Sequence, residues 1–150
     1  MAFYRLVDFL ERINLNMNKI ETFNNIDALF DFLKKLSESN LLTELCGLIG
    51  LTQEKKIVYK KMQNISKNPD QFFSIDPYEY LMFIKNYECL AVFHSHLVGD
   101  ESPSEFDVKT SENCCYPFII YSICSEKFSI YEPHYKDYDV NILQGLREKI

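Results

Sequence analysis

Two of the three histidines in this chain stand two positions apart, at His94 and His96, in the segment AVFHSHLVGDESPSEFD. Residues i and i+2 of a strand point to the same side, so a strand over CLAVFHSH would direct both imidazoles toward one point. Asp107 falls on the first turn of a helix predicted to begin at Ser104, and its carboxylate can supply a third ligand. Two imidazoles and one carboxylate leave a fourth position for water, which is the open arrangement of a catalytic zinc ion. Bound zinc lowers the pKa of such a water to about 7, so hydroxide becomes available at neutral pH.

The same residues also have simpler interpretations. A histidine pair is commonly a polar surface feature or a hydrogen-bonded pair in a core, and Ser104 followed by Asp107 has the spacing of a helix capping box. A zinc deaminase would need His-x-Glu and Pro-Cys-x-x-Cys, and this sequence has neither. An iron site built from two histidines and one carboxylate matches the ligand types and stays open, although it gives no role to Glu44 or Ser104. The third histidine, His134, lies in the polar segment EPHYKDY and is expected at the surface.

The spacing His-Ser-His, seven residues, Ser, two residues, Asp resembles the signature of the JAMM metalloproteases, also called MPN+ or JAB proteins. Upstream, TELCGLIG is similar to the other block of that family, a glutamate before an apolar-Cys-Gly strand start. The similarity extends from the helix at Ile26 to the strand that ends near Tyr131. An Asn, Pro and Phe-x-Ile pattern over residues 64–75 and Pro-Phe at 117–118 agree with bacterial and phage members. The resemblance implies a curved mixed β-sheet flanked by helices, similar to the cytidine deaminase fold.

The resemblance also implies roles for individual residues. Three of them match the zinc ligands of the family: His94, His96 and Asp107. Glu44 matches the glutamate that hydrogen-bonds the zinc-bound water, and it would serve as the general base. At the mouth of a buried strand this carboxylate would be partly desolvated, which raises its pKa toward that task. Ser104 matches the serine that donates to the developing oxyanion, and it can cap its helix as well. Ser95 is expected to point to the opposite face and to support the strand.

Hydrophobic periodicity predicts the elements that must position these residues. Helices are expected from Asn24 or Asn25 to about Asn40, from Asp76 to Asn86, and from Ser104 onward. Strands are expected over ELCGLIGL, KKIVYKKM, CLAVFHSH, PFIIYSI and KFSIYEP, with a short one over residues 72–74. In the helix that begins at Asp76, Tyr80, Leu81 and Ile84 are expected to face inward. The order predicts a single α/β domain in which helices pack on a mixed sheet.

Three parts of the chain are distinguished by their patterns. Residues 1–20 are expected to form a helical extension, residues 21–135 the JAMM-like domain, and residues 136–150 a tail that can include a helix.

With 150 residues, 47% of them hydrophobic, the chain is long enough for one domain with a core. A net charge of −6 argues against nucleic-acid binding. No run of about 20 apolar residues predicts a membrane span. Five cysteines without CxxC spacing, and no secretory leader pattern, indicate the reducing cytoplasm.

The function implied by the resemblance is that of a zinc-dependent isopeptidase or peptidase. Its substrate would be an amide bond after the C-terminal tail of a ubiquitin-like protein, in a conjugate or a precursor. Such a tail can bind as an added strand through backbone hydrogen bonds. Two alternatives remain: a phage tail-assembly peptidase, and a non-catalytic scaffold or binding module of the same fold. The expected partner is therefore a ubiquitin-like protein or its conjugate, with no nucleic acid and no membrane, and the oligomeric state is open.

Overall fold

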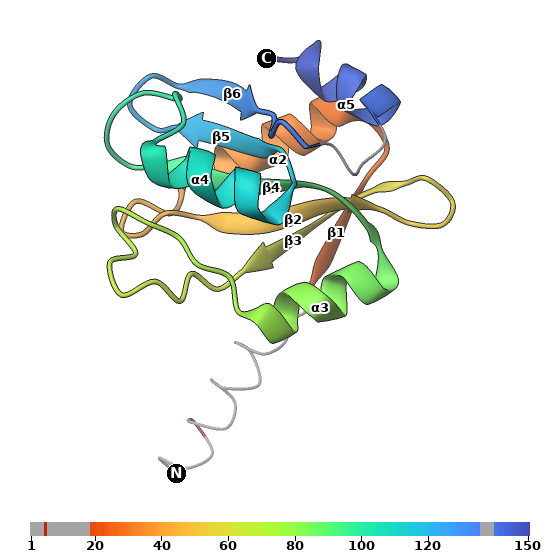
Figure 1. The fold of residues 1–150 in the computed structure, drawn as a ribbon, viewed down its shortest axis with the longest axis horizontal. Helices are drawn as coiled ribbons and strands as arrows, with labels where there is room; N and C mark the ends of the chain where they lie inside the picture. The colour runs from red at the N-terminus through yellow and green to blue at the C-terminus, as the bar shows by residue number, and fades with distance from the viewer. Residues whose placement is uncertain (1–4, 6–18, 136–139) are drawn as a thin grey trace.

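The protein folds as a mixed α/β domain built on one six-stranded sheet (Figure 1). The computed structural model describes residue 5, residues 19–135 and residues 140–150. Its elements, in chain order, are β1 (Ile20–Phe23), α2 (Ile26–Glu38), β2 (Cys46–Leu51), β3 (Ile57–Met62), α3 (Pro77–Asn86), β4 (Glu88–His96), α4 (Glu105–Cys114), β5 (Phe118–Ser122), β6 (Lys127–Tyr131) and α5 (Val140–Arg147).

The strands lie in the order β1-β3-β2-β4-β5-β6, and the sheet is not closed into a barrel. β4 and β5 run parallel and are connected through α4, whereas the other neighbouring pairs of described strands are antiparallel. The predicted fold class, a single domain with a mixed sheet flanked by helices, is confirmed. Because β4 is central and covered on both faces, its sequence is an almost continuous apolar run up to the histidines.

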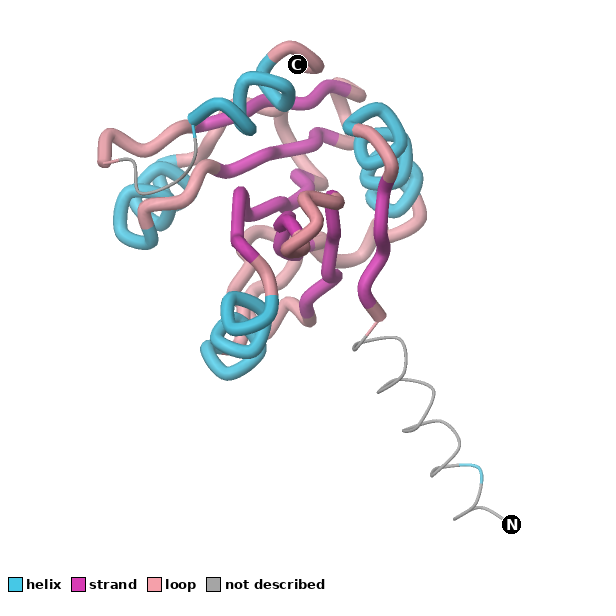
Figure 2. Tube along the Cα trace, turned by 90° about the vertical axis from the view of Figure 1, so that its right-hand side faces the viewer, coloured by secondary structure: helices cyan, strands magenta, loops and turns pink. Residues whose placement is uncertain are grey.

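Helices cover both faces of the sheet (Figures 1 and 2). α2 and α5 pack on one face, where Leu29 and Leu33 of α2 and Leu146 of α5 join the buried residues of the strands. α3 and α4 lie over the other face, where Phe83 of α3 belongs to a second core cluster with Phe73 of the β3–α3 loop. This second face is the one to which the histidines of β4 belong, so α4 and the β3–α3 loop determine what surrounds them.

Residues 72–74 were expected as a short strand, and that prediction is wrong. The segment joins no ladder: the Asn64 side chain bonds to two of its backbone groups, and the backbone N–H of Ile65 donates to the carbonyl of Ser74 at 2.9 Å. The Asn64 amide donates to the carbonyl of Phe72 at 2.9 Å, and its Oδ1 accepts from the backbone N–H of Ser74 at 3.1 Å. One side chain and a single backbone hydrogen bond therefore take the place of a strand ladder.

Two further details differ from the expectations. The edge strand β1 was not predicted, since its four residues, IETF, are too few to establish a period. In α3 the predicted inward face is only partly right: Tyr80 is half-buried and packs on the second core cluster, but Leu81 is 57% exposed and Ile84 is 37% exposed, whereas Phe83 is 2% exposed. Apolar residues lie on more than one side of this helix, so periodicity alone could not select the buried side.

The predicted N-terminal helix falls outside the described residues. At the other end, α5 supplies the helix that the C-terminal tail was expected to allow, with Gly145 placed close to Ile26 of α2. The described helices include none that combines the length and the apolarity needed to cross a bilayer.

Position 47 lies directly opposite Lys61 on β3. Neighbouring atoms approach its backbone so closely that only glycine fits there. A Cβ atom at this position would lie 2.4 Å from Cε2 of Tyr59 and 2.5 Å from the carbonyl oxygen of Lys60. The second contact is with backbone and cannot be relieved by a side-chain rotation. We expect Gly47→Ala to lower the free energy of unfolding in urea by about 2–3 kcal/mol. The exposed control Lys61→Ala should change it by less than about 1 kcal/mol. Equal stabilities would contradict this packing.

Candidate metal centre

The end of β4 brings two imidazole rings together. His94 and His96 are separated by one residue, and their Nε2 atoms lie 3.2 Å apart. His94 is fully buried and His96 is 8% exposed. Ser95 between them has the opposite orientation: its Oγ accepts from the backbone N–H of Leu45 at 2.8 Å, which ties β4 to the start of β2. The alternation of a strand thus places both rings on one side, as the sequence predicts.

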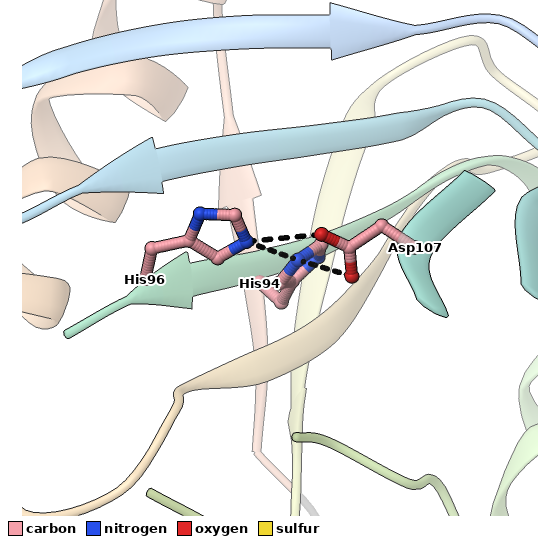
Figure 3. Close-up of side chains that lie close together, drawn as sticks. All are labelled: His94, His96 and Asp107. Atoms are coloured by element: carbon pink, nitrogen blue, oxygen red, sulfur yellow. Dashed lines mark hydrogen bonds and ion pairs between the residues drawn. The ribbon is translucent and has the colours of Figure 1, made fainter. Parts of the chain in front are cut away.

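Asp107, on the first turn of α4, completes the cluster (Figure 3). Its Oδ1 lies 3.0 Å from Nε2 of His94, and its Oδ2 lies 3.0 Å from Nε2 of His96. The capping box of α4 orients the carboxylate, because the N–H of Ser104 donates to Oδ2 at 2.9 Å while Oγ of Ser104 accepts from the N–H of Asp107 at 3.1 Å. The helix cap is therefore present, and its geometry is compatible with Asp107 also serving as a metal ligand.

A backbone carbonyl fixes the orientation of His96. Nδ1 of this ring lies 2.9 Å from the carbonyl oxygen of Asp100. Because a carbonyl can only accept, Nδ1 carries the hydrogen, and in the neutral ring Nε2 then presents a lone pair toward Asp107. Two electron-rich atoms 3.0 Å apart need a proton or a cation between them. Hydrogen bonding of the outer ring nitrogen in this manner is characteristic of histidines that bind metals.

His94 is held mainly by packing. Its ring stacks on Phe73 with centroids 4.5 Å apart at 26°, and it meets the edge of Phe118 at 5.5 Å. Among the described residues none offers a hydrogen bond to its buried Nδ1. Apart from the contact of its Nε2 with Asp107, the ring is therefore held by its aromatic neighbours.

The protonation states follow from burial and from these contacts. Although burial alone would raise it, hydrogen bonds from His94 and His96 keep the pKa of Asp107 well below its usual range. Complete burial lowers the pKa of His94, and its contact with Asp107 offsets only part of that effect. Burial acts on His96 in the same direction, but hydrogen bonds to Asp107 and to the carbonyl of Asp100 outweigh it and raise the pKa of His96.

The three side chains meet the requirements of a small divalent transition metal. Nitrogen and oxygen atoms of His94, His96 and Asp107 all lie within 4.8 Å of one another. In a tetrahedral zinc site with bonds of about 2.0–2.2 Å, neighbouring donor atoms are about 3.3–3.6 Å apart. The observed separations of 3.0–3.2 Å are close to that spacing. Two imidazoles with one ionised carboxylate are also a donor set that zinc accepts in open sites.

The register of the sheet brings Glu44 to the same place. Cys46 pairs with His94, and the N–H of Ser95 donates to the carbonyl of Leu45, so the position opposite His96 is that of Glu44. Glu44 is 7% exposed, and burial raises its pKa to about 7 against the opposing influence of His96. This carboxylate can therefore both accept and release a proton near neutral pH.

Glu44, His96 and Ser104 line one open cavity of about 580 Å³. Ser104 is exposed there, and the cap uses its Oγ as an acceptor, which leaves the hydroxyl hydrogen to donate elsewhere. His134 lies elsewhere, hydrogen-bonded to Glu112 with its side chain 91% exposed, as expected for a surface residue. All five predicted site residues, Glu44, His94, His96, Ser104 and Asp107, therefore lie in one region of the fold.

Three residues that contribute to this region carried no predicted role. Asn64 donates to the carbonyl of Glu44 at 3.1 Å and thereby fixes the backbone that carries the carboxylate. Phe73 packs on His94, and Asp100 uses its carbonyl rather than its side chain. Asn64 and Phe73 belong to the pattern over residues 64–75 noted above, which was the available signal. A backbone carbonyl leaves no trace in side-chain identity, so no signal pointed to Asp100.

Comparisons with known proteins give the fold but no family. No family model matches the sequence, and no curated protein matches it. Among solved structures, the chain is similar to the solution structure of protein DSY2949 from Desulfitobacterium hafniense, with a TM-score of 0.52 and 23% sequence identity. The similarity covers 67% of this chain and 75% of that one. At this identity the likeness supports the architecture alone.

The geometry predicts that the protein binds one zinc ion. In a competition titration with a chromophoric chelator, His96→Ala should bind zinc more than about 100-fold more weakly than wild type, since even losing an outer hydrogen bond to a ligand costs 10–100-fold. The control His134→Ala should bind as wild type does, because this ring is bonded to Glu112 outside the cluster. Equal zinc affinity for His96→Ala and wild type would refute the ligand assignment.

The raised pKa of Glu44 predicts how the stability of the zinc-free protein changes with pH. Folding favours the protonated carboxyl, so its contribution is present below the unfolded pKa of about 4.5 and is lost as pH rises through about 7. In EDTA, Glu44→Gln should therefore be more stable than wild type at pH 8.5, by about 2 kcal/mol in urea unfolding, and about equal at pH 4.5. The control Glu54→Gln, at an exposed position, should change the free energy of unfolding by less than about 1 kcal/mol. A constant difference at both pH values would contradict the burial effect.

Proposed function

We propose that this chain is a zinc-dependent hydrolase of amide bonds, a JAMM-type isopeptidase or peptidase that acts after the C-terminal tail of a ubiquitin-like protein. The observation that carries the proposal is the position of Glu44 across from His96. Two histidines and one aspartate alone would suit several metals and several reactions. A buried carboxylate with a pKa near 7 beside them supplies the proton-transfer group that amide hydrolysis needs, and an iron oxygenase would give it no task.

In this proposal His94, His96 and Asp107 hold the zinc ion. When bound, zinc supplies Lewis-acid chemistry, which polarises the substrate carbonyl and makes water more acidic. Asp107 remains ionised and His94 remains neutral because of their surroundings, so these two residues need not lose a proton before metal binding.

Glu44 is the general base and then the general acid. It takes the proton from the attacking water and returns it to the nitrogen of the leaving amine. A pKa near 7 suits both steps, because the group is then neither too weak a base nor too weak an acid at neutral pH. The hydrogen bonds of its backbone to Pro69 and Asn64 limit how far the carboxylate can move.

Ser104 stabilises the oxyanion that develops as water adds to the carbonyl. Its hydroxyl hydrogen is free of the helix cap and its side chain lines the cavity. Such a donor contributes roughly 10²–10³-fold in rate where its role has been measured in other hydrolases.

The cavity suits an extended tail. Leu41, Leu42 and Val98 on its rim are 59%, 86% and 85% exposed, so they offer apolar contacts for a peptide. Asp70 contributes negative charge to the same cavity, which favours a basic residue in the tail. The cytoplasm is the compartment that we assign, because all five cysteines are unpaired.

A cleavage assay tests the proposal. The zinc-loaded protein is incubated with a panel of ubiquitin-like proteins, each fused through its C-terminal tail to a reporter. We expect wild type to cleave at least one fusion, and Glu44→Gln to retain zinc while losing at least about 100-fold in kcat/KM. The control His134→Ala should cleave as wild type does.

Two results would overturn the proposal. If Glu44→Gln cleaves as fast as wild type, Glu44 is not the proton-transfer group. If wild type binds zinc and captures a fusion without cleaving it, the chain is a binding module of this fold. Cleavage of a phage tail precursor, added to the panel, with no cleavage of ubiquitin-like fusions would instead assign the tail-assembly role.

A further inference from the structure

The loop of residues 97–103 joins the two halves of the candidate metal centre, since it leaves β4 at His96 and enters α4 at Ser104. It contains Gly99 with a φ of 85°, a backbone conformation that residues other than glycine rarely adopt. Much of the loop is exposed, so little packing against the core holds it in place. What fixes its conformation must therefore be its hydrogen bonds.

Those hydrogen bonds come from serines of the β5–β6 hairpin. Ser122 donates from Oγ to the carbonyl of Gly99 at 2.7 Å, and Ser129 donates from Oγ to the carbonyl of Glu101. Ser125 adds a bond from its hydroxyl to the carboxylate of Glu101 at 2.6 Å. Residues on either side of Asp100 are thus held by hydroxyl groups of one hairpin.

Asp100, between these two anchored residues, is the one whose carbonyl accepts from Nδ1 of His96. The hairpin itself is fixed beside His96, because Ser122 is the register partner of His96 and the N–H of Ile123 donates to the carbonyl of His96 at 3.0 Å. The path from the serine hydroxyls to the imidazole is therefore short: hydrogen bonds hold Gly99 and Glu101, and the backbone between them carries the Asp100 carbonyl that bonds to His96.

We propose that Ser122 and Ser129 are positioning residues of the metal centre, which hold the carbonyl of Asp100 on His96 and so keep Nε2 of His96 available to the metal. The inference rests on the proposed metal site but not on the proposed reaction. Ser122 is suited to this role because it is fully buried and its Oγ also accepts from the N–H of Ser125 at 3.1 Å. Its hydroxyl therefore both donates and accepts a hydrogen bond, and these two bonds together fix its orientation.

The physical effect is a pre-organised ligand. Neutral histidine in water prefers the tautomer with hydrogen on Nε2, which cannot bind a metal through that atom. A carbonyl held at Nδ1 selects the opposite tautomer before the metal arrives. If the loop were not held by hydrogen bonds, zinc binding would have to order it, and the lost conformational entropy would weaken the affinity. Loss of the serine hydroxyls should therefore weaken metal affinity without removing a ligand.

The test compares zinc affinity in Ser122→Ala, Ser129→Ala and the double variant, by chelator competition at one pH. We expect each single variant to bind zinc about 3–10-fold more weakly and the double variant about 10–100-fold more weakly. The matched control is Ser37→Ala, which removes another fully buried hydroxyl that donates to a backbone carbonyl, that of Leu33, but in α2 on the opposite face. Ser37→Ala should change zinc affinity less than about 2-fold, even if it lowers the free energy of unfolding as much as Ser122→Ala does.

A second measurement needs neither zinc nor turnover. Nitrogen chemical shifts of the His96 ring, recorded on labelled zinc-free protein at pH 9, report which nitrogen carries the hydrogen. Wild type and Ser37→Ala should show the Nδ1-protonated ring, and the double variant should shift toward the Nε2-protonated one. Unchanged zinc affinity, or an unchanged tautomer in the double variant, would overturn the inference. A failure of the proposed reaction would appear only in the cleavage assay.

Discussion

The organisation of this protein depends on one buried carboxylate. Asp107 faces an imidazole with each of its oxygens and accepts a backbone N–H at the start of α4. A buried charge is expensive unless it is surrounded by hydrogen bonds, and here the two rings, the cap and the helix N-terminus provide that compensation together. The two rings come from β4, and the cap and the helix N-terminus belong to α4, so the charge is compensated only when β4 and α4 are correctly placed.

The sheet order explains how those elements meet. In the β4–α4–β5 unit the parallel strands end on the same edge, and α4 begins beside that edge, as in other α/β sheets whose sites lie at the carboxyl ends of strands. β2 runs antiparallel to β4, so its beginning lies next to the end of β4, and Glu44 arrives opposite His96. Glu44, 52 residues before His96 in the sequence, thus reaches the cluster through the pairing of β2 with β4. The same antiparallel geometry lets Ser95 anchor Leu45, which connects the two strands at the site.

Around the three clustered side chains, most of the supporting hydrogen bonds involve backbone N–H and carbonyl groups. Asn64 organises the β3–α3 loop by bonding to backbone groups of Glu44, Phe72 and Ser74, and this loop then delivers Phe73 to the face of His94. The expected strand over residues 72–74 is absent for this reason: the backbone of the segment bonds to the Asn64 side chain and to the N–H of Ile65 instead of to a neighbouring strand. In α3 the hydrophobic periodicity selected the buried side only in part, for a different reason: apolar residues also lie on the exposed side, so the pattern did not single out Phe83 as the buried position.

From the sequence alone one could determine the donor types, the alternation that pairs His94 with His96, and the cap that places Asp107 on a first helical turn. These are local features, set by the two-residue period of a strand and by the spacing of a capping box. Only the tertiary structure decided that Glu44 lies opposite His96, that Asn64 holds the loop beside it, and that a carbonyl of Asp100 orients the ring. Strand register and backbone acceptors join residues far apart in the chain or contribute no side chain, so local spacing carries no record of them.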